Sequence, residues 1–303
     1  MRNHVGSGDP TYGGATHPCP AASPWNRRPA LVTSDTPDAP TPDVSQPAPD
    51  PSVHIYGLTK RFGEHVAVDN LSLMVMPGEF FGFLGPNGAG KTTTIRMLVG
   101  LLKPDAGDVV IAGHHLSHDP AGLKASIGLL PEELNLYERL TAREFIQFAG
   151  TMYGLAGDEV RARTEELLQL LELDDHANKM IVDHSAGMKK KTAMAAALIH
   201  NPRVLFLDEP FGGVDAVSSR GIRHILDQLI ERGTTIFFSS HILDLAQRLC
   251  TRVGIIHEGM LRAVGTLDEL REAAGLASDA SLEDVFLALV GAAPDKDELS
   301  WIS

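Results

Sequence analysis

Gly85-Pro-Asn-Gly-Ala-Gly-Lys-Thr92 is the stretch of sequence that decides the predicted fold. It matches the spacing G-x-x-x-x-G-K-[ST], which is typical of loops that bind nucleotide phosphates. An apolar segment at 79–84 precedes the loop and predicts a buried strand, and residues 91–102 follow with a helical pattern. Glycines let successive backbone N–H groups face a polyanion without side-chain clashes, and a helix N-terminus also favours an anion. The sequence therefore predicts nucleotide binding at a strand–loop–helix junction, with a ligand-free glycine-rich turn as the alternative.

Each position of this loop has an expected part in binding. Lys91 is expected to reach the β- and γ-phosphates, and Thr92 to hold Mg²⁺ through its hydroxyl. The remaining positions are expected to contact the nucleotide: Gly85, Pro86, Asn87, Gly88, Ala89, Gly90 and Thr93.

Two carboxylates follow a second apolar segment, at the end of the predicted strand Val204–Asp208. In a parallel sheet the carboxyl ends of the strands open onto the ligand crevice. Asp208 suits Mg²⁺, which prefers carboxylates together with phosphate and water. Glu209 is placed to polarise an attacking water as a general base. A strand that simply ends in a charged turn is the alternative, and the phosphate loop argues against it.

Strand-like and helix-like segments alternate over much of the chain, which predicts an α/β fold with a largely parallel sheet. A helical insertion over about 135–201 interrupts this alternation. Residues 1–51 are rich in proline and small polar residues and show no hydrophobic period, so they are predicted to be a disordered tail. Residues 276–303 are expected to form a C-terminal helix and tail, with an apolar helix face made of Leu282, Val285, Phe286 and Leu289.

Polar side chains mark the ends of the helices expected inside the insertion. Thr141 and Glu144 form a capping-box pattern, and Asp158 and Ser185 are expected to cap two further helices. The basic run Lys189–Lys191 is predicted to be a solvated helix face.

Net charge, cysteine content and the length of the apolar runs exclude several classes of protein. The net charge is −13, from 39 acidic and 26 basic residues, which argues against a general nucleic-acid binder. The two cysteines, Cys19 and Cys250, are far apart, which fits a reducing cytoplasm. No apolar run is long enough for a membrane span, and the N-terminus lacks the apolar core of a signal peptide. Action at a membrane is therefore expected to require a partner.

These motifs, together with the loop 184–188 and His241, make the chain resemble the ATPase subunits of ATP-binding cassette (ABC) transporters over about residues 53–291. The resemblance implies a P-loop ATPase domain at 52–275, with a mostly parallel core sheet, an antiparallel β subdomain and a helical subdomain. It also implies that the loop 184–188 corresponds to the family's signature loop, where Ser185 and Gly187 would contact ATP held by the opposite protomer. His241 resembles the family's switch histidine, which would contact the γ-phosphate.

The resemblance extends to three further positions. Phe62 matches the aromatic that stacks on adenine, with Tyr56 as the alternative. Glu132 stands where most members have a metal-contacting glutamine, and a glutamate can only accept hydrogen bonds. Asp215, in the stretch 213–215, matches a loop that crosses the dimer interface.

The resemblance also implies partners and a cycle. Residues 129–148, the run after Ser185 and the C-terminal helix resemble the branch that serves drug, antibiotic or lipid exporters, whose permease is a separate chain. Two protomers, identical or different, would close around two MgATP beneath that permease, on the inner face of the membrane. The alternatives are a soluble cassette ATPase without a permease, a small-molecule kinase, and a nucleotide sensor without turnover.

Overall fold

The computed structural model describes residues 50–214 and 216–291. The predicted tail therefore lies outside the described residues, apart from Asp50 and Pro51, and so do Asp215 and the segment after 291. The domain boundaries drawn from the sequence stay predictions.

The central sheet has six strands in the order β10-β9-β3-β8-β7-β6, and only its β9–β10 pair is antiparallel. Every residue of β3, β7 and β8 is buried, as the apolar runs in these segments predict for strands covered on both faces. The predicted parallel core is therefore confirmed. The strands are β3 (Phe80–Leu84), β6 (Ile127–Leu130), β7 (Val204–Asp208), β8 (Thr235–Ser240), β9 (Arg252–His257) and β10 (Met260–Gly265).

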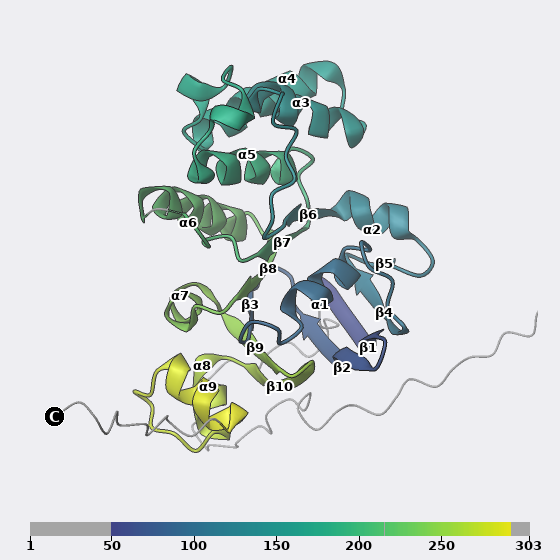
Figure 1. Cartoon of the computed structure of the whole chain (residues 1–303), viewed down its shortest axis with the longest axis vertical. Helices are drawn as coiled ribbons and strands as arrows, with labels where there is room; N and C mark the ends of the chain where they lie inside the picture. Colours follow the sequence, from purple (N-terminus) through teal and green to yellow (C-terminus); the bar gives the residue numbers. More distant parts are fainter. Residues whose placement is uncertain (1–49, 215, 292–303) are drawn as a thin grey trace, which may run out of the picture. The chain divides into compact units, whose positions relative to one another are not determined.

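A second sheet is antiparallel, with the order β2-β1-β4-β5. Helix α1 (Lys91–Leu98) contacts both β2 of this sheet and β7 of the central sheet (Figure 1). One hydrophobic cluster consequently joins Val53 and Leu71 to Phe83 and Phe206. The strands are β1 (Val53–Phe62), β2 (His65–Val75), β4 (Ala106–Ile111) and β5 (His114–His115), and α2 (Pro120–Ser126) follows them.

The predicted helical insertion is present as α3 (Ala142–Met152), α4 (Gly157–Leu170) and α5 (Ala186–Leu198), grouped together in Figure 1. Short 3₁₀ turns at Asp174–His176 and Ile181–Asp183 connect α4 to α5. Both sides of the Thr141–Glu144 capping box form at the start of α3, which confirms that prediction.

One predicted cap is correct and another is wrong. The Ser185 hydroxyl accepts a hydrogen bond from the N–H of Met188 and caps α5. Helix α4, in contrast, has Ala156 as its N-cap, in extended backbone, without a side-chain bond. Asp158 therefore lies inside the first turn, where its charge favours the positive helix end without capping it.

The remaining helices are α6 (Ala216–Glu231), α7 (Leu243–Leu249), α8 (Leu267–Ala273) and α9 (Leu282–Val290). Helix α9 packs on α7, α8 and β10, with Leu282 and Val285 buried and Phe286 and Leu289 half-buried. The predicted apolar face is confirmed. Among the described residues, no helix is long and apolar enough to span a bilayer.

Candidate functional site

The glycine-rich loop connects β3 to α1 and is held by close backbone approaches. A Cβ at Gly85 would lie 2.3 Å from the carbonyl oxygen of Ile256, and one at Gly90 would lie 2.5 Å from that of Ala67. Gly90 is also the N-cap of α1 with φ of 105°, and no side chain caps this helix. The first backbone N–H groups of α1 are therefore available to an anion.

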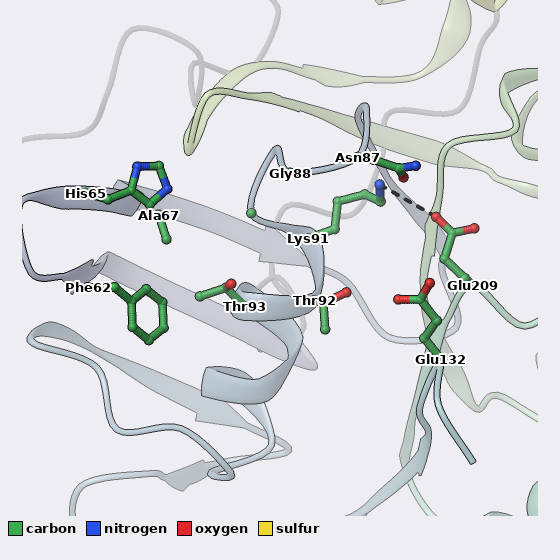
Figure 2. Close-up of a pocket in the computed structure, with 11 residues that line it drawn as sticks. Phe62, His65, Ala67, Asn87, Gly88, Lys91, Thr92, Thr93, Glu132 and Glu209 are labelled. Atoms are coloured by element: carbon green, nitrogen blue, oxygen red, sulfur yellow. Dashed lines mark ion pairs between the residues drawn. The ribbon is translucent and has the colours of Figure 1, made fainter.

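Lys91, the first residue of α1, is buried at 6% exposure. Its Nζ donates to the carbonyl oxygens of Gly85 at 2.8 Å and Pro86 at 3.2 Å. The same Nζ lies 3.6 Å from Oε1 of Glu209, forming an ion pair (Figure 2). The loop and the carboxylate at the end of β7 thus meet at this ammonium group.

The paired carboxylates are fixed by the register of β7 and β8, in which Asp208 lies opposite Ser239. The Ser239 hydroxyl donates to Oδ1 of Asp208 at 2.6 Å, and the N–H of Glu209 points to the same hydroxyl at 3.2 Å. Glu209 is buried and has φ of 48°, an uncommon conformation for a residue with a side chain. Strain of this kind gathers at functional sites.

His241 completes the cluster from the end of β8. Its Nδ1 lies 2.9 Å from Oε1 of Glu209, and its side chain is 48% exposed. The carboxylate of Glu209 is thus held between a buried ammonium and an imidazole that solvent can reach.

A cavity of about 480 Å³ extends from this cluster. Figure 2 shows Phe62 and His65 at one end, Lys91 and Glu209 at the other, and Thr92 and Thr93 between them. The cavity is lined by Phe62, His65, Ala67, Asn87, Gly88, Gly90, Lys91, Thr92, Thr93, Glu132 and Glu209.

The structure places some expected residues elsewhere. Ser185 is exposed and Gly187 is buried at the start of α5, and neither lines this cavity. Tyr56 does not line it either, since its ring packs 3.7 Å from that of His54. Phe62, half-exposed at the end of β1, does line it. Gly85, Pro86 and Ala89 do not line the cavity, since the carbonyl oxygens of Gly85 and Pro86 accept from Lys91 and Ala89 is buried.

The burial of Lys190 and Lys191 contradicts the prediction that residues 189–191 form a solvated helix face. Lys190 and Lys191 are only 6% and 7% exposed. Helix α5 packs against α3, α4 and α6 together, so neighbours cover most of its circumference. Sequence periodicity cannot show this, because the covering helices come from distant parts of the chain.

Lys190 is linked to the carboxylate cluster. Its Nζ donates to the carbonyl oxygens of Glu209 at 2.9 Å and Gly212 at 2.7 Å. Burial lowers the pKa of Lys190, and the carboxylates of Glu209 and Glu132 act in the opposite direction. Lys189 and Lys191 instead form ion pairs with Glu138 and Glu172, at 2.7 Å and 3.1 Å.

Sequence reasoning also missed Ser239 and His65. Ser239 precedes His241 by two positions, but only the β7–β8 register shows that it faces Asp208. His65 begins β2 opposite Phe62 across the hairpin, so the two side chains share one end of the cavity.

Comparisons with known proteins agree with this geometry. The family model described as ABC transporter matches residues 68–212. The linearmycin resistance ATP-binding protein LnrL of Bacillus subtilis is 40% identical over 213 residues, covering 70% of this chain and 68% of the relative. The daunorubicin resistance ATP-binding protein DrrA3 of Streptomyces coeruleorubidus is 37% identical over 226 residues, covering 75% and 72%.

Solved structures show the same fold. An ATP-binding subunit of an ABC transporter superposes with a TM-score of 0.74 at 32% identity, covering 78% of this chain and 98% of that one. A dimeric ATP-binding cassette in a post-hydrolysis state, bound to ADP and Pi, gives 0.66 at 28% identity, covering 71% and 98%. These relatives share the fold that places the phosphate loop beside the carboxylates of Asp208 and Glu209. The chain therefore belongs to the ABC transporter family, as an ATP-binding and ATP-hydrolysing subunit.

Proposed function

We propose that this chain hydrolyses ATP to drive a separate membrane permease that exports drug-like, antibiotic or lipid-like compounds. The observation that carries the catalytic part is the position of Glu209 between Lys91 and His241, at the end of a nucleotide-sized cavity. A sensor without turnover would have no need of a buried carboxylate there.

ATP would lie along the cavity with its base at Phe62 and its γ-phosphate near Lys91. Phe62 is 52% exposed and presents an aromatic face at the cavity end, which suits stacking on adenine. The N–H groups of the loop and the ammonium of Lys91 would hold the phosphates.

Hydrolysis would use this chain's own groups at the phosphate end. Glu209 would orient a water in line with the γ-phosphorus and accept its proton as the P–O bond to ADP breaks. His241 would hold the carboxylate in position through its Nδ1 contact. Lys91 would balance the negative charge that develops on the phosphate oxygens.

The oxygen ligands for Mg²⁺ would come from Thr92, Asp208 and Glu132. Hydroxyl and carboxylate oxygens are the hard donors that this ion prefers, and Asp208 has its position set by Ser239. When bound, the ion would neutralise charge on the β- and γ-phosphates. Glu132 would act only as an acceptor, where the family usually has a glutamine.

A second protomer would complete the site. Ser185 lies exposed at the N-terminus of α5, away from the cavity of its own chain. Its hydroxyl and the N–H of Gly187 could therefore meet a γ-phosphate bound by another copy or a related chain.

Coupling to the permease would involve the helical region. Tyr137, Phe148 and Met152 are 60%, 43% and 71% exposed, and the rings of Tyr137 and Phe148 lie 5.5 Å apart, edge to face. An exposed aromatic pair of this kind is typical of interfaces.

The drug-resistance relatives LnrL and DrrA3 support export as the direction of transport. The chain would act on the cytoplasmic face of the membrane.

The test is capture of a tagged Glu209→Gln chain from gently solubilised membranes in MgATP. We expect one multi-spanning protein in stoichiometric amount, and we expect Phe148→Asp in the same background to lose it while ATP binding is kept. Recovery of a dimer without a membrane partner would move the function to permease-free cassette ATPases.

Phe62→Ala is expected to weaken ATP binding about tenfold, because base–aromatic stacking contributes about 1–3 kcal/mol. Binding of inorganic triphosphate should not change, since it has no base to stack. Titration calorimetry with both ligands measures the difference, and Tyr56→Ala is the matched control. If Tyr56→Ala weakens ATP binding and Phe62→Ala does not, the assignment of the stacking residue is wrong.

Lys190→Met is expected to reduce both stability and turnover. The substitution removes one of the two donors to the buried carbonyl of Glu209, which keeps the N–H of Gly212, and the ammonium donor to the partly buried carbonyl of Gly212. An unsatisfied carbonyl costs about 1–3 kcal/mol. The backbone of Glu209 should shift, so kcat should fall more than ATP affinity. Chemical denaturation and steady-state kinetics measure these effects. Lys189→Met, which removes only an exposed ion pair, should change stability by less than about 1 kcal/mol.

A further inference from the structure

A second cluster of chemically active side chains lies in the antiparallel sheet, outside the ATP cavity. Asp108 of β4, His115 of β5 and His118 in the following turn each offer one ligand atom, and these atoms all lie within 4.8 Å of one another. None of the three lines the cavity that holds Lys91 and Glu209. Nothing in the proposed ATPase cycle uses them.

The backbone fixes two of these side chains on one face of the sheet. Val110 of β4 pairs directly with His115 of β5. Asp108 precedes Val110 by two positions on β4, so its side chain points to the same face as those of the Val110–His115 pair. This face is the solvated one, because the neighbouring Val109 and Ile111 point into the core.

A tight turn then returns the third side chain to the cluster. The N–H groups of His118 and Asp119 donate to the carbonyl oxygen of His115, at 3.3 Å and 2.8 Å. The rings of His115 and His118 consequently lie 5.7 Å apart, edge to face. The spacing of the two imidazoles is thus set by main-chain bonds.

Hydrogen bonds already connect the three side chains, with Ser117 between Asp108 and His118. Oδ2 of Asp108 lies 3.3 Å from Nδ1 of His115 and accepts a hydrogen bond from Ser117 Oγ at 2.7 Å. Ser117 Oγ also lies 2.6 Å from Nδ1 of His118. Burial alone would raise the pKa of Asp108, but the hydrogen bonds from Ser117 and the backbone lower it on balance.

We propose that Asp108, His115 and His118 bind one divalent transition-metal ion of the Zn²⁺ class. Two imidazoles and one carboxylate form a donor set that suits Zn²⁺, whereas Mg²⁺ and Ca²⁺ prefer oxygen ligands alone. The fourth position is open to water or to the hydroxyl of Ser117. The bound ion would connect β5 and the turn before α2 to β4, and its binding would not require ATP.

His114 offers a matched control beside the cluster. Its Nδ1 lies 2.7 Å from Oδ2 of Asp119, and Oδ1 of Asp119 caps α2 through the N–H of Gly122. His114 points away from Asp108, because neighbouring residues of a strand face opposite sides of a sheet. A histidine-rich surface in general would use His114 as readily as His115.

The test is metal binding by the full chain without a histidine tag, in nucleotide-free buffer near neutral pH. We expect one Zn²⁺ per chain by titration calorimetry, a higher midpoint of thermal unfolding with Zn²⁺ but not with Mg²⁺ or Ca²⁺, and visible absorption of bound Co²⁺ typical of low coordination number. His115→Ala and His118→Ala should each weaken Zn²⁺ binding by about 10- to 100-fold or more, while His114→Ala should bind as the parent does.

Three outcomes would overturn the proposal: no stoichiometric Zn²⁺ binding, equal binding by the double variant His115→Ala/His118→Ala, or an equal loss in His114→Ala. The variants should fold, since His115 and His118 are exposed and His114 is half-buried at the surface, and unchanged ATP hydrolysis by each of them checks this. The Co²⁺ spectrum reports the ligand set directly and does not depend on activity.

Discussion

Glu209→Gln is expected to lower the rate of ATP hydrolysis by about 100- to 1,000-fold while ATP binding is kept. The amide has nearly the size of the carboxylate, and its oxygen can still accept a hydrogen bond from His241 and the ammonium of Lys91. It cannot accept a proton from the attacking water at neutral pH. ATP should therefore remain intact in the closed state, and the dimer should persist. Phosphate release and size-exclusion chromatography in MgATP measure the two effects.

Two comparisons make this result specific. Glu231→Gln removes an exposed carboxylate at the end of α6 and should leave the rate of phosphate release unchanged. A Glu209→Gln chain that stays monomeric in ATP while the parent dimerises would contradict the proposed cycle. So would a Glu209→Gln chain that hydrolyses ATP at the parent rate, since another group would then act as the base.

Lys91→Met is expected to weaken ATP binding by about tenfold or more, because a charge-assisted hydrogen bond contributes about 1.5–3 kcal/mol. It should also destabilise the free protein, since Glu209 would keep its buried charge without the ammonium 3.6 Å away. Adding Glu209→Gln should recover part of that stability, because the amide carries no charge. Calorimetry with ATP and chemical denaturation of both single variants and the double variant measure the coupling.

An additive result would argue against the ion pair. If Lys91→Met and Glu209→Gln change the free energy of unfolding independently, the two groups do not interact in solution. If Lys91→Met binds ATP as tightly as the parent, the phosphates lie elsewhere than the loop. Glu231→Gln, at the exposed end of α6 and away from the cavity, serves again as the unaffected comparison.

The sequence by itself determined the parts of this protein that depend on local chemistry. The phosphate loop was readable because only glycine permits its φ values and close approaches at Gly90. The buried strands were readable because β3, β7 and β8 each contain a short run of large apolar side chains. The caps at Thr141 and Ser185 were readable because each satisfies N–H groups within its own first turn. These patterns need no knowledge of distant neighbours.

Only the tertiary structure decided which distant residues meet. Glu209 and His241 come together because β7 and β8 are neighbours in parallel register, and Ser239 faces Asp208 for the same reason. Lys190 is buried because three helices from other parts of the chain surround α5. A lysine in a helix carries no local mark of such burial, since periodicity reports one helix and not its neighbours. Pairing and burial are properties of the assembled chain, and they appear only when the elements pack.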